Sequence, residues 1–297
     1  MTISISKLYC LNPTGFHRIS CTVWSALHHA RPLVCAHGFS RNGRDFDALA
    51  SALSDTYQVY CPDAAGRGHS DWLEQREHYN YDQYLRDNAT LLSHITAPLP
   101  DEPSRPSPSV DWVGTSMGGL VGMMLGAQPH NPIRRLVLND IGAQISAASL
   151  NRIGEYVRET PTFETVADYQ AHLADIHASF GPLDETQWQH LAHHSHRMED
   201  GRVVPHYDPK IASAFDQPVE ADVELWSLWS AIDIPTLVIR GGQSDLLASE
   251  TLDRMVELKP DTQVLEIPDA GHAPALMRDH EIAAIRAFLS DPSLGPD

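Results

Sequence analysis

The chain has few basic residues and no long apolar run. Its 21 lysines and arginines stand against 39 aspartates and glutamates, which gives a formal net charge of −18 at pH 7 with histidine neutral. A surface this acidic repels phosphate backbones and anionic lipids, and no local basic cluster offsets it, so we expect neither a nucleic-acid nor a membrane partner. No apolar stretch approaches the ~18 residues of a membrane span, and the start MTISISKLYC lacks a signal-peptide pattern, which predicts a cytoplasmic protein.

Cysteine is also scarce. Four cysteines, too few and too scattered for a disulfide framework, lie inside or beside apolar, strand-like runs, at Cys10, Cys21, Cys35 and Cys61. We expect buried free thiols, although Cys10 and Cys21 could face each other across a hairpin. The 42% of hydrophobic residues supply ample material for a core, in two domains or in one large domain with an insertion.

Short apolar runs alternate with helical patterns along most of the chain. Two short strands, at 7–11 and 17–25, flank a turn rich in Asn, Pro and Gly and predict a hairpin. Further apolar runs follow at 32–36, 58–61, 110–113, 135–138, 236–239 and 263–267. Nearly continuous apolar runs separated by amphipathic helices are typical of a parallel sheet that is buried on both faces. We therefore predict an α/β fold with a mostly parallel, eight-stranded, doubly wound sheet.

Two segments interrupt this alternation. Residues 97–109 are rich in Pro and Ser and predict an exposed loop. Residues 143–230 are too long for a crossover and have helical patterns of their own, for example at 163–180 and 184–198. We therefore expect a helical cap at 143–230 inserted into a core made of 1–142 and 231–297.

A nucleophile is predicted where one strand ends. The run at 110–113 leads directly into Gly114-Thr115-Ser116-Met117-Gly118, and a helix-compatible stretch follows. A G-x-S-x-G pattern places serine on a sharp strand-to-helix turn, where the residues two before and two after must be small. Ser116 would then project from the carboxyl edge of the sheet, beside the free N–H groups of the helix.

A serine hydroxyl needs a base, and the base needs an orienting acid. His272 follows the last predicted strand, and Asp245 follows the strand before it, so both reach the edge where Ser116 emerges. The chain order Ser116, Asp245, His272 is the nucleophile, acid, base order of α/β-hydrolases. Asp140, after the strand at 135–138, is the competing candidate for the acid.

The remaining site candidates surround this predicted triad. The backbone N–H groups of Phe39 and Met117 are the expected oxyanion donors, one from the loop after the strand at 32–36 and one from the helix after Ser116. Arg41 is a candidate to bind a substrate carboxylate, with a salt bridge to Asp45, Asp47 or another acidic residue of the surface as the alternative. Trp226 and Trp229 could wall the acyl pocket or, alternatively, pack the cap onto the sheet.

These segments together resemble the α/β-hydrolase superfamily, in its branch of cap-bearing bacterial serine esterases and carbon–carbon bond hydrolases. The resemblance covers essentially the whole chain outside the cap and rests on five motifs: AHGFSRNGRDF (36–46), PDAAGRGHSDW (62–72), GTSMGG (114–119), RGGQSD (240–245) and DAGHAP (269–274). It implies a cofactor-free hydrolase that works through an acyl-enzyme or a closely related intermediate. Relatives that cleave ring-fission products often have Asn before the nucleophile and Trp after the base, whereas this chain has Thr115 and Ala273.

The sequence therefore predicts a serine hydrolase of small or medium carboxylic esters, with a small-molecule substrate and no cofactor. A carbon–carbon bond hydrolase of a ring-fission-type diketone acid is the same-fold alternative, and a non-enzymatic small-ligand receptor is the alternative from another class. His190 and His194 have the spacing of a helical metal pair, but no Cys or suitably placed Glu completes a site, so we expect no metal. The sequence leaves a homodimer open.

Overall fold

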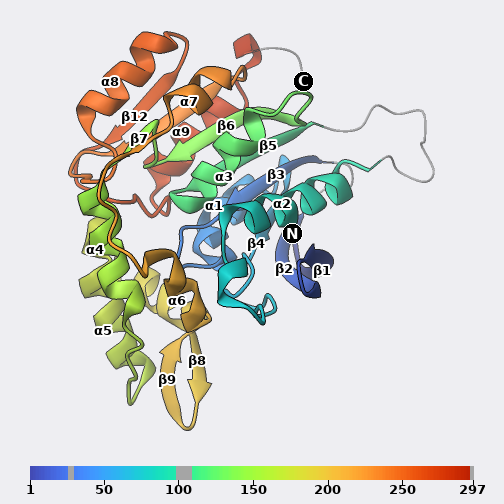
Figure 1. Ribbon diagram of the computed structural model, residues 1–297. Coiled ribbons are helices and arrows are strands. Elements are labelled where there is room, and N and C mark those ends of the chain that lie inside the picture. Colours follow the sequence, from blue (N-terminus) through green and yellow to red (C-terminus); the bar gives the residue numbers. More distant parts are fainter. Residues whose placement is uncertain (26–29, 98–108, 295–297) are drawn as a thin grey trace.

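The computed structural model describes residues 1–25, 30–97 and 109–294. Nearly all of the loop predicted at 97–109 lies outside these residues. Eight strands form one sheet, which confirms the predicted fold class (Figure 1). In spatial order they are β1 (Thr2–Asn12), β2 (Gly15–Ser25), β4 (Tyr57–Pro62), β3 (Arg31–Ala36), β5 (Val110–Thr115), β6 (Ile133–Asn139), β11 (Thr236–Gly241) and β12 (Gln263–Ile267). The predicted hairpin β1–β2 is antiparallel and pairs antiparallel with β4, and the pairs from β4 to β12 are parallel.

Helices alternate with these strands along the chain. The α-helices are α1 (Asp47–Leu53), α2 (Tyr81–Ile95), α3 (Met117–Gly126), α4 (Ala147–Arg158), α5 (Val166–Ile176), α6 (Glu185–Ser195), α7 (Trp226–Ala231), α8 (Ser249–Leu258) and α9 (Asp279–Leu289). Short 3-10 turns are η1 (Gly43–Phe46), η2 (Arg76–His78), η3 (Ala178–Phe180), η4 (Pro209–Phe215) and η5 (Pro292–Leu294). No helix in the described part of the chain is long and apolar enough to cross a membrane.

Both faces of the central strands are buried, because successive residues of these strands belong to different hydrophobic clusters. Trp112 and Leu136 pack into the cluster that includes residues of α2, α3, α7 and α8, whereas their neighbours Val113 and Val137 pack into the cluster that includes residues of α1 and α9. Alternating side chains of a strand point to opposite faces, so a strand covered on both faces must be apolar at every position. This burial explains the continuous apolar runs in the sequence.

The chain between β6 and β11 forms a separate group of elements beside the sheet (Figure 1). It contains α4, α5 and α6, a hairpin of β8 (His196–Glu199) and β9 (Arg202–Pro205), and the short pair β7 (Gln144–Ile145) and β10 (Val223–Glu224). The helical pattern predicted at 184–198 ends early, because the helix stops at Ser195. Asp200 and Gly201 both have positive φ in the turn of the β8–β9 hairpin, and Asp-Gly is a strong hairpin signal.

All four cysteines are buried free thiols, as expected. Cys10 and Cys21 do not face each other across the hairpin, because Cys10 pairs with His17 and Cys21 pairs with Ser6. Burial raises the pKa of Cys10 to about 12, so this thiol stays protonated at neutral pH. These cysteines are therefore small apolar side chains of the core.

Candidate active site

Ser116 occupies the sharp turn that the sequence predicts. It lies between the end of β5 and the start of α3, with φ 50° and ψ −113°, a backbone conformation that a non-glycine residue adopts only under constraint. The turn is crowded on both sides: a Cβ added at Gly114 would lie 2.4 Å from Gly118 O, and one at Gly118 would lie 2.1 Å from Ala36 O. Glycine at both positions lets the strand and helix pack this closely.

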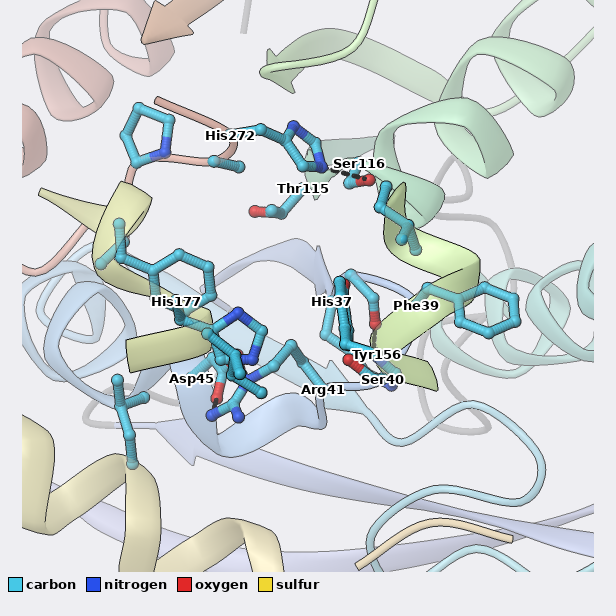
Figure 2. Close-up of a pocket in the computed structure, with 18 of the residues that line it drawn as sticks. His37, Phe39, Ser40, Arg41, Asp45, Thr115, Ser116, Tyr156, His177 and His272 are labelled. Carbon is cyan, nitrogen blue, oxygen red and sulfur yellow. Dashed lines mark hydrogen bonds and ion pairs between the residues drawn. The ribbon is translucent and has the colours of Figure 1, made fainter. Parts of the chain in front are cut away.

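His272 lies beside Ser116, on the loop after β12. Its Nε2 is 3.0 Å from Ser116 Oγ (Figure 2). Its Nδ1 is 2.7 Å from Asp140 Oδ2. The loop is fastened at two points: Asn139 Nδ2 donates to Pro274 O over 2.8 Å, and Ser179 Oγ donates to the carbonyl of His272. The imidazole therefore connects a serine hydroxyl with a carboxylate and is held in place from two other elements.

The carboxylate in this relay belongs to Asp140, and the prediction that Asp245 orients His272 is wrong. Asp140 follows β6 directly and is fully buried; its Oδ1 accepts the Gly241 N–H over 2.8 Å, and its Oδ2 accepts the Ser244 hydroxyl over 2.6 Å as well as the His272 contact. These donors stabilise a buried carboxylate that faces the imidazole. Ser116, Asp140, His272 is also a nucleophile, acid, base order, so chain order alone could not choose between the two aspartates.

Asp245 lies farther along the loop after β11 and points elsewhere. Its carboxylate accepts hydrogen bonds from Nε and Nη2 of Arg152, over 2.7 and 2.9 Å. The side chain of Asp245 is 48% exposed. Partial burial acts to raise the pKa of Asp245, but the ion pair with Arg152 dominates and holds this pKa below its ordinary value. Asp245 is thus the partner of an arginine on α4.

The loop after β3 forms another side of the site and is held rigidly. His37 Nδ1 lies 2.7 Å from Gly38 O, and its Nε2 accepts the Ala64 N–H over 2.9 Å. Both contacts fit a neutral imidazole, and burial lowers the pKa of His37 to about 4. The buried Arg67 donates from Nε to Phe39 O over 2.9 Å, with its guanidinium 4.8 Å from the centroid of the Phe39 ring.

The two residues predicted to supply oxyanion donors both belong to the surroundings of Ser116. Phe39 lines the pocket that contains Ser116, and Met117 is the first residue of α3. The first N–H groups of a helix have no partner within the helix, so the Met117 N–H is free to act as a donor. The role of both amides in stabilising an oxyanion stays a prediction.

A pocket opens above Ser116, with an empty volume of about 750 Å³, part of it open to solvent. Figure 2 shows Ser116, Thr115 and His272 on one side of this space and His177, Arg41 and Asp45 across it. The segment between β6 and β11 supplies a mostly apolar wall, from Ile153, Tyr156, Ile176, Phe180 and Leu191. Pockets of this kind, apolar with few polar groups, suit small organic ligands.

Trp226 and Trp229 are absent from the pocket wall in the described part of the chain, which contradicts their prediction as substrate-binding residues. Trp229 is fully buried against the core, where its Nε1 donates to Met255 O over 3.1 Å. The guanidinium of Arg254 lies 4.0 Å from the centroid of the Trp226 ring. Both tryptophans belong to α7, where the chain has already returned to the sheet, so they pack elements together.

Arg41 does line the pocket, and it also forms the salt bridge that the sequence offered as the alternative. Its Nε and Nη2 donate to the two oxygens of Asp45, each over 2.8 Å. Sequence reasoning missed the pocket residues Tyr156 and His177. His177 lies within the helical pattern predicted at 163–180, but such a pattern does not indicate which face points to the pocket. Tyr156 lies on α4, for which no such pattern was described.

One cluster near the site has metal-ligand chemistry. His190, His194 and Asp47 bring ligand atoms within 4.8 Å of one another. However, the Arg44 guanidinium donates from Nε to both oxygens of Asp47, over 2.8 and 2.9 Å, and so already places a cation on this carboxylate. His190 Nε2 lies 3.1 Å from Arg44 O. The cluster joins α6 to the core, and its arginine disfavours a metal ion.

Comparisons with known proteins identify related sequences and structures. The model of the alpha/beta hydrolase family matches residues 33–285. A 3-hydroxybutyrate-oligomer hydrolase of Cupriavidus necator is 39% identical over 293 residues, which cover 95% of this chain and 96% of that protein. A crystal structure of a hydrolase from Rickettsia typhi superposes with a TM-score of 0.87 at 33% identity, covering 97% of this chain and 99% of that one.

A second solved structure, an alpha/beta hydrolase from Novosphingobium aromaticivorans, gives a TM-score of 0.84 at 33% identity over 97% of this chain and 99% of its own. The family match spans the strand before the Phe39 loop, the Ser116 turn and the His272 loop. Both the sequence relative and the first structure bear the name of a hydrolase. The chain is a member of the α/β hydrolase family.

Proposed function

We propose that this enzyme is a serine hydrolase that cleaves small or medium carboxylic esters through an acyl-enzyme. The observation that carries the proposal is the relay Ser116–His272–Asp140, which opens into a largely apolar pocket. In this mechanism His272 takes the proton of Ser116 Oγ as that oxygen attacks the ester carbonyl carbon. Asp140 fixes the tautomer of His272 and stabilises the imidazolium that forms.

The tetrahedral intermediate needs donors for its oxyanion, and the N–H groups of Phe39 and Met117 are the proposed pair. Collapse of the intermediate breaks the bond to the alcohol oxygen, and His272 returns its proton to the departing alkoxide. Water then attacks the acyl-enzyme by the same route in reverse, with His272 as base, and releases the acid. Every proton in this cycle passes through His272, so no cofactor is required.

Short oligomers of 3-hydroxybutyrate are the substrate class that we propose. Support comes from the Cupriavidus necator relative named for that activity, whose match covers nearly the whole chain and so includes the inserted segment. Such an oligomer is a compact, aliphatic ester, which suits the apolar wall formed by residues such as Ile153 and Leu191. A helical cap at 143–230 remains our proposal for the unit that shapes this wall.

Replacement of Ser116 by alanine tests the proposal. The variant should keep its fold and lose nearly all turnover on p-nitrophenyl butyrate, with only a residual rate from binding and the oxyanion donors. A fluorophosphonate should label Ser116 in the wild type and leave the alanine variant unlabelled, as measured by mass spectrometry. A variant that keeps a tenth of the wild-type rate would remove Ser116 from the mechanism.

The same assay separates the other two hypotheses. A ring-fission-type diketone acid, run beside the ester panel, reports on carbon–carbon bond cleavage, which Thr115 and Ala273 make the less favoured chemistry. A protein that binds these compounds but turns over none of them would be a receptor.

A further inference from the structure

Arg41 stands out among the pocket residues because it is a buried cation. Its side chain is 6% exposed, and besides the pocket above Ser116 it lines a neighbouring cavity with an empty volume of about 320 Å³, together with Tyr156 and His177. Burial of an arginine is costly unless its charge and donors are satisfied. The ion pair with Asp45 neutralises the charge but leaves part of the hydrogen-bonding capacity of the guanidinium unused.

The donors of Arg41 are not all used. A guanidinium has five N–H donors, and Asp45 accepts from Nε and Nη2. Within residues 1–25, 30–97 and 109–294 no other acceptor for this side chain is found. Nη1, with the open side of Nη2, is therefore left as a planar pair of donors, and such a pair matches the two oxygens of a carboxylate.

The surroundings do not supply a competing cation. Desolvation lowers the pKa of the buried His177 well below its ordinary value, so this neighbour is neutral at pH 7. Arg152, the other arginine of the pocket, is held by Asp245. Asp45 binds the edge of the guanidinium formed by Nε and Nη2, which leaves the edge formed by Nη1 and Nη2 for a second anion. The ion pair with Asp45 also fixes the orientation of the guanidinium.

Arg41 is also close enough to Ser116 to contact the same substrate. Arg41 Cγ and Ser116 Cβ each lie 3.9 Å from the position that a Cβ on Gly38 would take, so they lie within twice that distance of each other. In a 3-hydroxybutyrate ester, four bonds separate the scissile carbonyl carbon from the carboxylate carbon of the next unit, a reach of about 5 Å when extended.

Building on the proposed ester hydrolysis, we infer that Arg41 binds the free carboxylate of a hydroxy-acid oligomer and so directs cleavage to its carboxyl end. The unit held by Arg41 is then the leaving group. Ser116 Oγ bonds to the adjacent carbonyl carbon, the bond from that carbon to the 3-oxygen of the terminal unit breaks, and His272 protonates this oxygen. One hydroxy acid leaves, and water releases the remaining chain as an acid from Ser116.

The experiment compares one substrate with and without its charge. The linear dimer of 3-hydroxybutyrate is assayed as free acid and as methyl ester, and the measured quantity is the ratio of the two kcat/KM values. Hydrogen bonds from a buried guanidinium to a carboxylate favour the free acid roughly 10- to 100-fold. Arg41→Gln should bring this ratio to about one, chiefly by raising KM for the free acid.

Arg44→Gln is the matched control. Arg44 lies three residues away and pairs with Asp47, but it is not among the described residues of the pocket. The wild-type ratio should persist in this variant. Because Arg41→Gln leaves Asp45 without its partner, the double change Arg41→Gln with Asp45→Asn is assayed beside it, and fluorophosphonate labelling of Ser116 checks that the site is formed.

Two results would overturn the inference. A wild-type ratio near one means that the carboxylate is not recognised, and a ratio that survives in both Arg41 variants places its recognition elsewhere. The proposed function fails separately: in that case the wild type cleaves neither the dimer, nor its methyl ester, nor p-nitrophenyl butyrate.

Discussion

Asp140 and Asp245 both follow strands of the sheet, yet their surroundings give them different tasks. Asp140 is fully buried and within 2.7 Å of His272, whereas Asp245 is half exposed and paired with Arg152. A carboxylate can orient an imidazole only through a direct hydrogen bond, which fixes the tautomer with the proton on Nδ1. The side chain that has this bond determines how His272 presents Nε2 to Ser116.

We expect Asp140→Asn to lower the turnover number by about 10⁴-fold, because the amide permits the wrong tautomer of His272. Asp245→Asn should change it by no more than a few-fold, since the exposed ion pair with Arg152 is weak. Both variants are measured on the same p-nitrophenyl ester, with circular dichroism to confirm the fold. If Asp245→Asn proves the crippling change and Asp140→Asn the mild one, the assignment of the acid is reversed.

His37 links the stability of the site to pH. Its pKa is about 4 in the folded protein because of burial, against an ordinary value of about 6.5 in the unfolded chain. Between these values the unfolded state binds more protons, so the free energy of unfolding falls as pH decreases from about 6.5 to about 4. The contribution of this one group is about 1.4 kcal/mol per pH unit.

His37→Gln should flatten this dependence. A glutamine amide can donate to Gly38 O and accept from Ala64 N without titrating, so the loop keeps both contacts. Urea unfolding at several pH values between about 4 and 7 measures the slope. An unchanged slope in the variant would mean that other groups, such as the buried His177, account for the acid sensitivity.

At the scale of elements, the turn between β5 and α3 is the most constrained point of the core. Gly118→Ala would push a methyl group into the backbone carbonyl of Ala36, which cannot move without shifting β3. We expect the free energy of unfolding to drop by about 1–3 kcal/mol or more, and activity to fall with it because Ser116 is displaced.

Gly126→Ala, at the other end of α3, is the control for this prediction. There the nearest atom to an added Cβ is Ile234 Cδ1, the tip of a flexible side chain, at 3.2 Å. Alanine also favours the helix over glycine by up to about 1 kcal/mol. Thermal unfolding should therefore show a clear loss of stability for Gly118→Ala and little or none for Gly126→Ala. Equal losses of stability would show that the packing of α3 in general, and not the turn, is sensitive to an added methyl group.

The elements themselves were largely predictable, because burial on both faces leaves a direct trace in the sequence. The runs at 110–113 and 135–138 lie within β5 and β6, and almost every residue of these two strands is buried. The Ser116 turn was predictable for a steric reason, since only small residues fit beside it. The insertion was harder: its hairpin β8–β9 interrupts a helical pattern at Ser195, where local propensity does not decide.

The sequence could not identify the aspartate that contacts His272, nor the residues of the pocket wall, because both depend on tertiary contacts. Two aspartates follow neighbouring strands, and the choice between them depends on which loop turns toward His272, a tertiary contact. Likewise, Trp226 and Trp229 are aromatic residues of the kind that often line a pocket. They lie on α7, however, where the chain has returned to the sheet, and there they pack against the core. The sequence predicts which residues lie at the end of a strand. It does not predict the direction in which a side chain points from a loop or from a helix of the segment between β6 and β11.

For the whole molecule, the pocket joins two parts of the chain with separate duties. The Ser116–His272–Asp140 relay belongs to the sheet, and much of the apolar wall belongs to the segment between β6 and β11. Substrate choice should therefore change with that wall while the reacting groups stay in place.

Leu191→Ala tests this division. Leu191 is buried on α6 and lines the pocket, so its truncation should move the preference for acyl length toward longer chains, by up to about tenfold in kcat/KM per methylene accommodated. A series of p-nitrophenyl esters from acetate to octanoate gives the profile. Trp226→Ala, which changes packing outside the pocket, should lower stability and keep the profile of the wild type. The opposite pattern would assign selection to α7.

The distribution of the relay along the chain also sets when activity can first appear. Ser116 and Asp140 follow the adjacent strands β5 and β6, but His272 follows β12, an edge strand that pairs only with β11 in the described part of the chain. A chain emerging from the ribosome in N-to-C order makes the proposed nucleophile and acid long before the proposed base, His272. We therefore expect no ester hydrolysis until the last strand docks. The time at which ester cleavage begins during synthesis or refolding would then report when the sheet is complete.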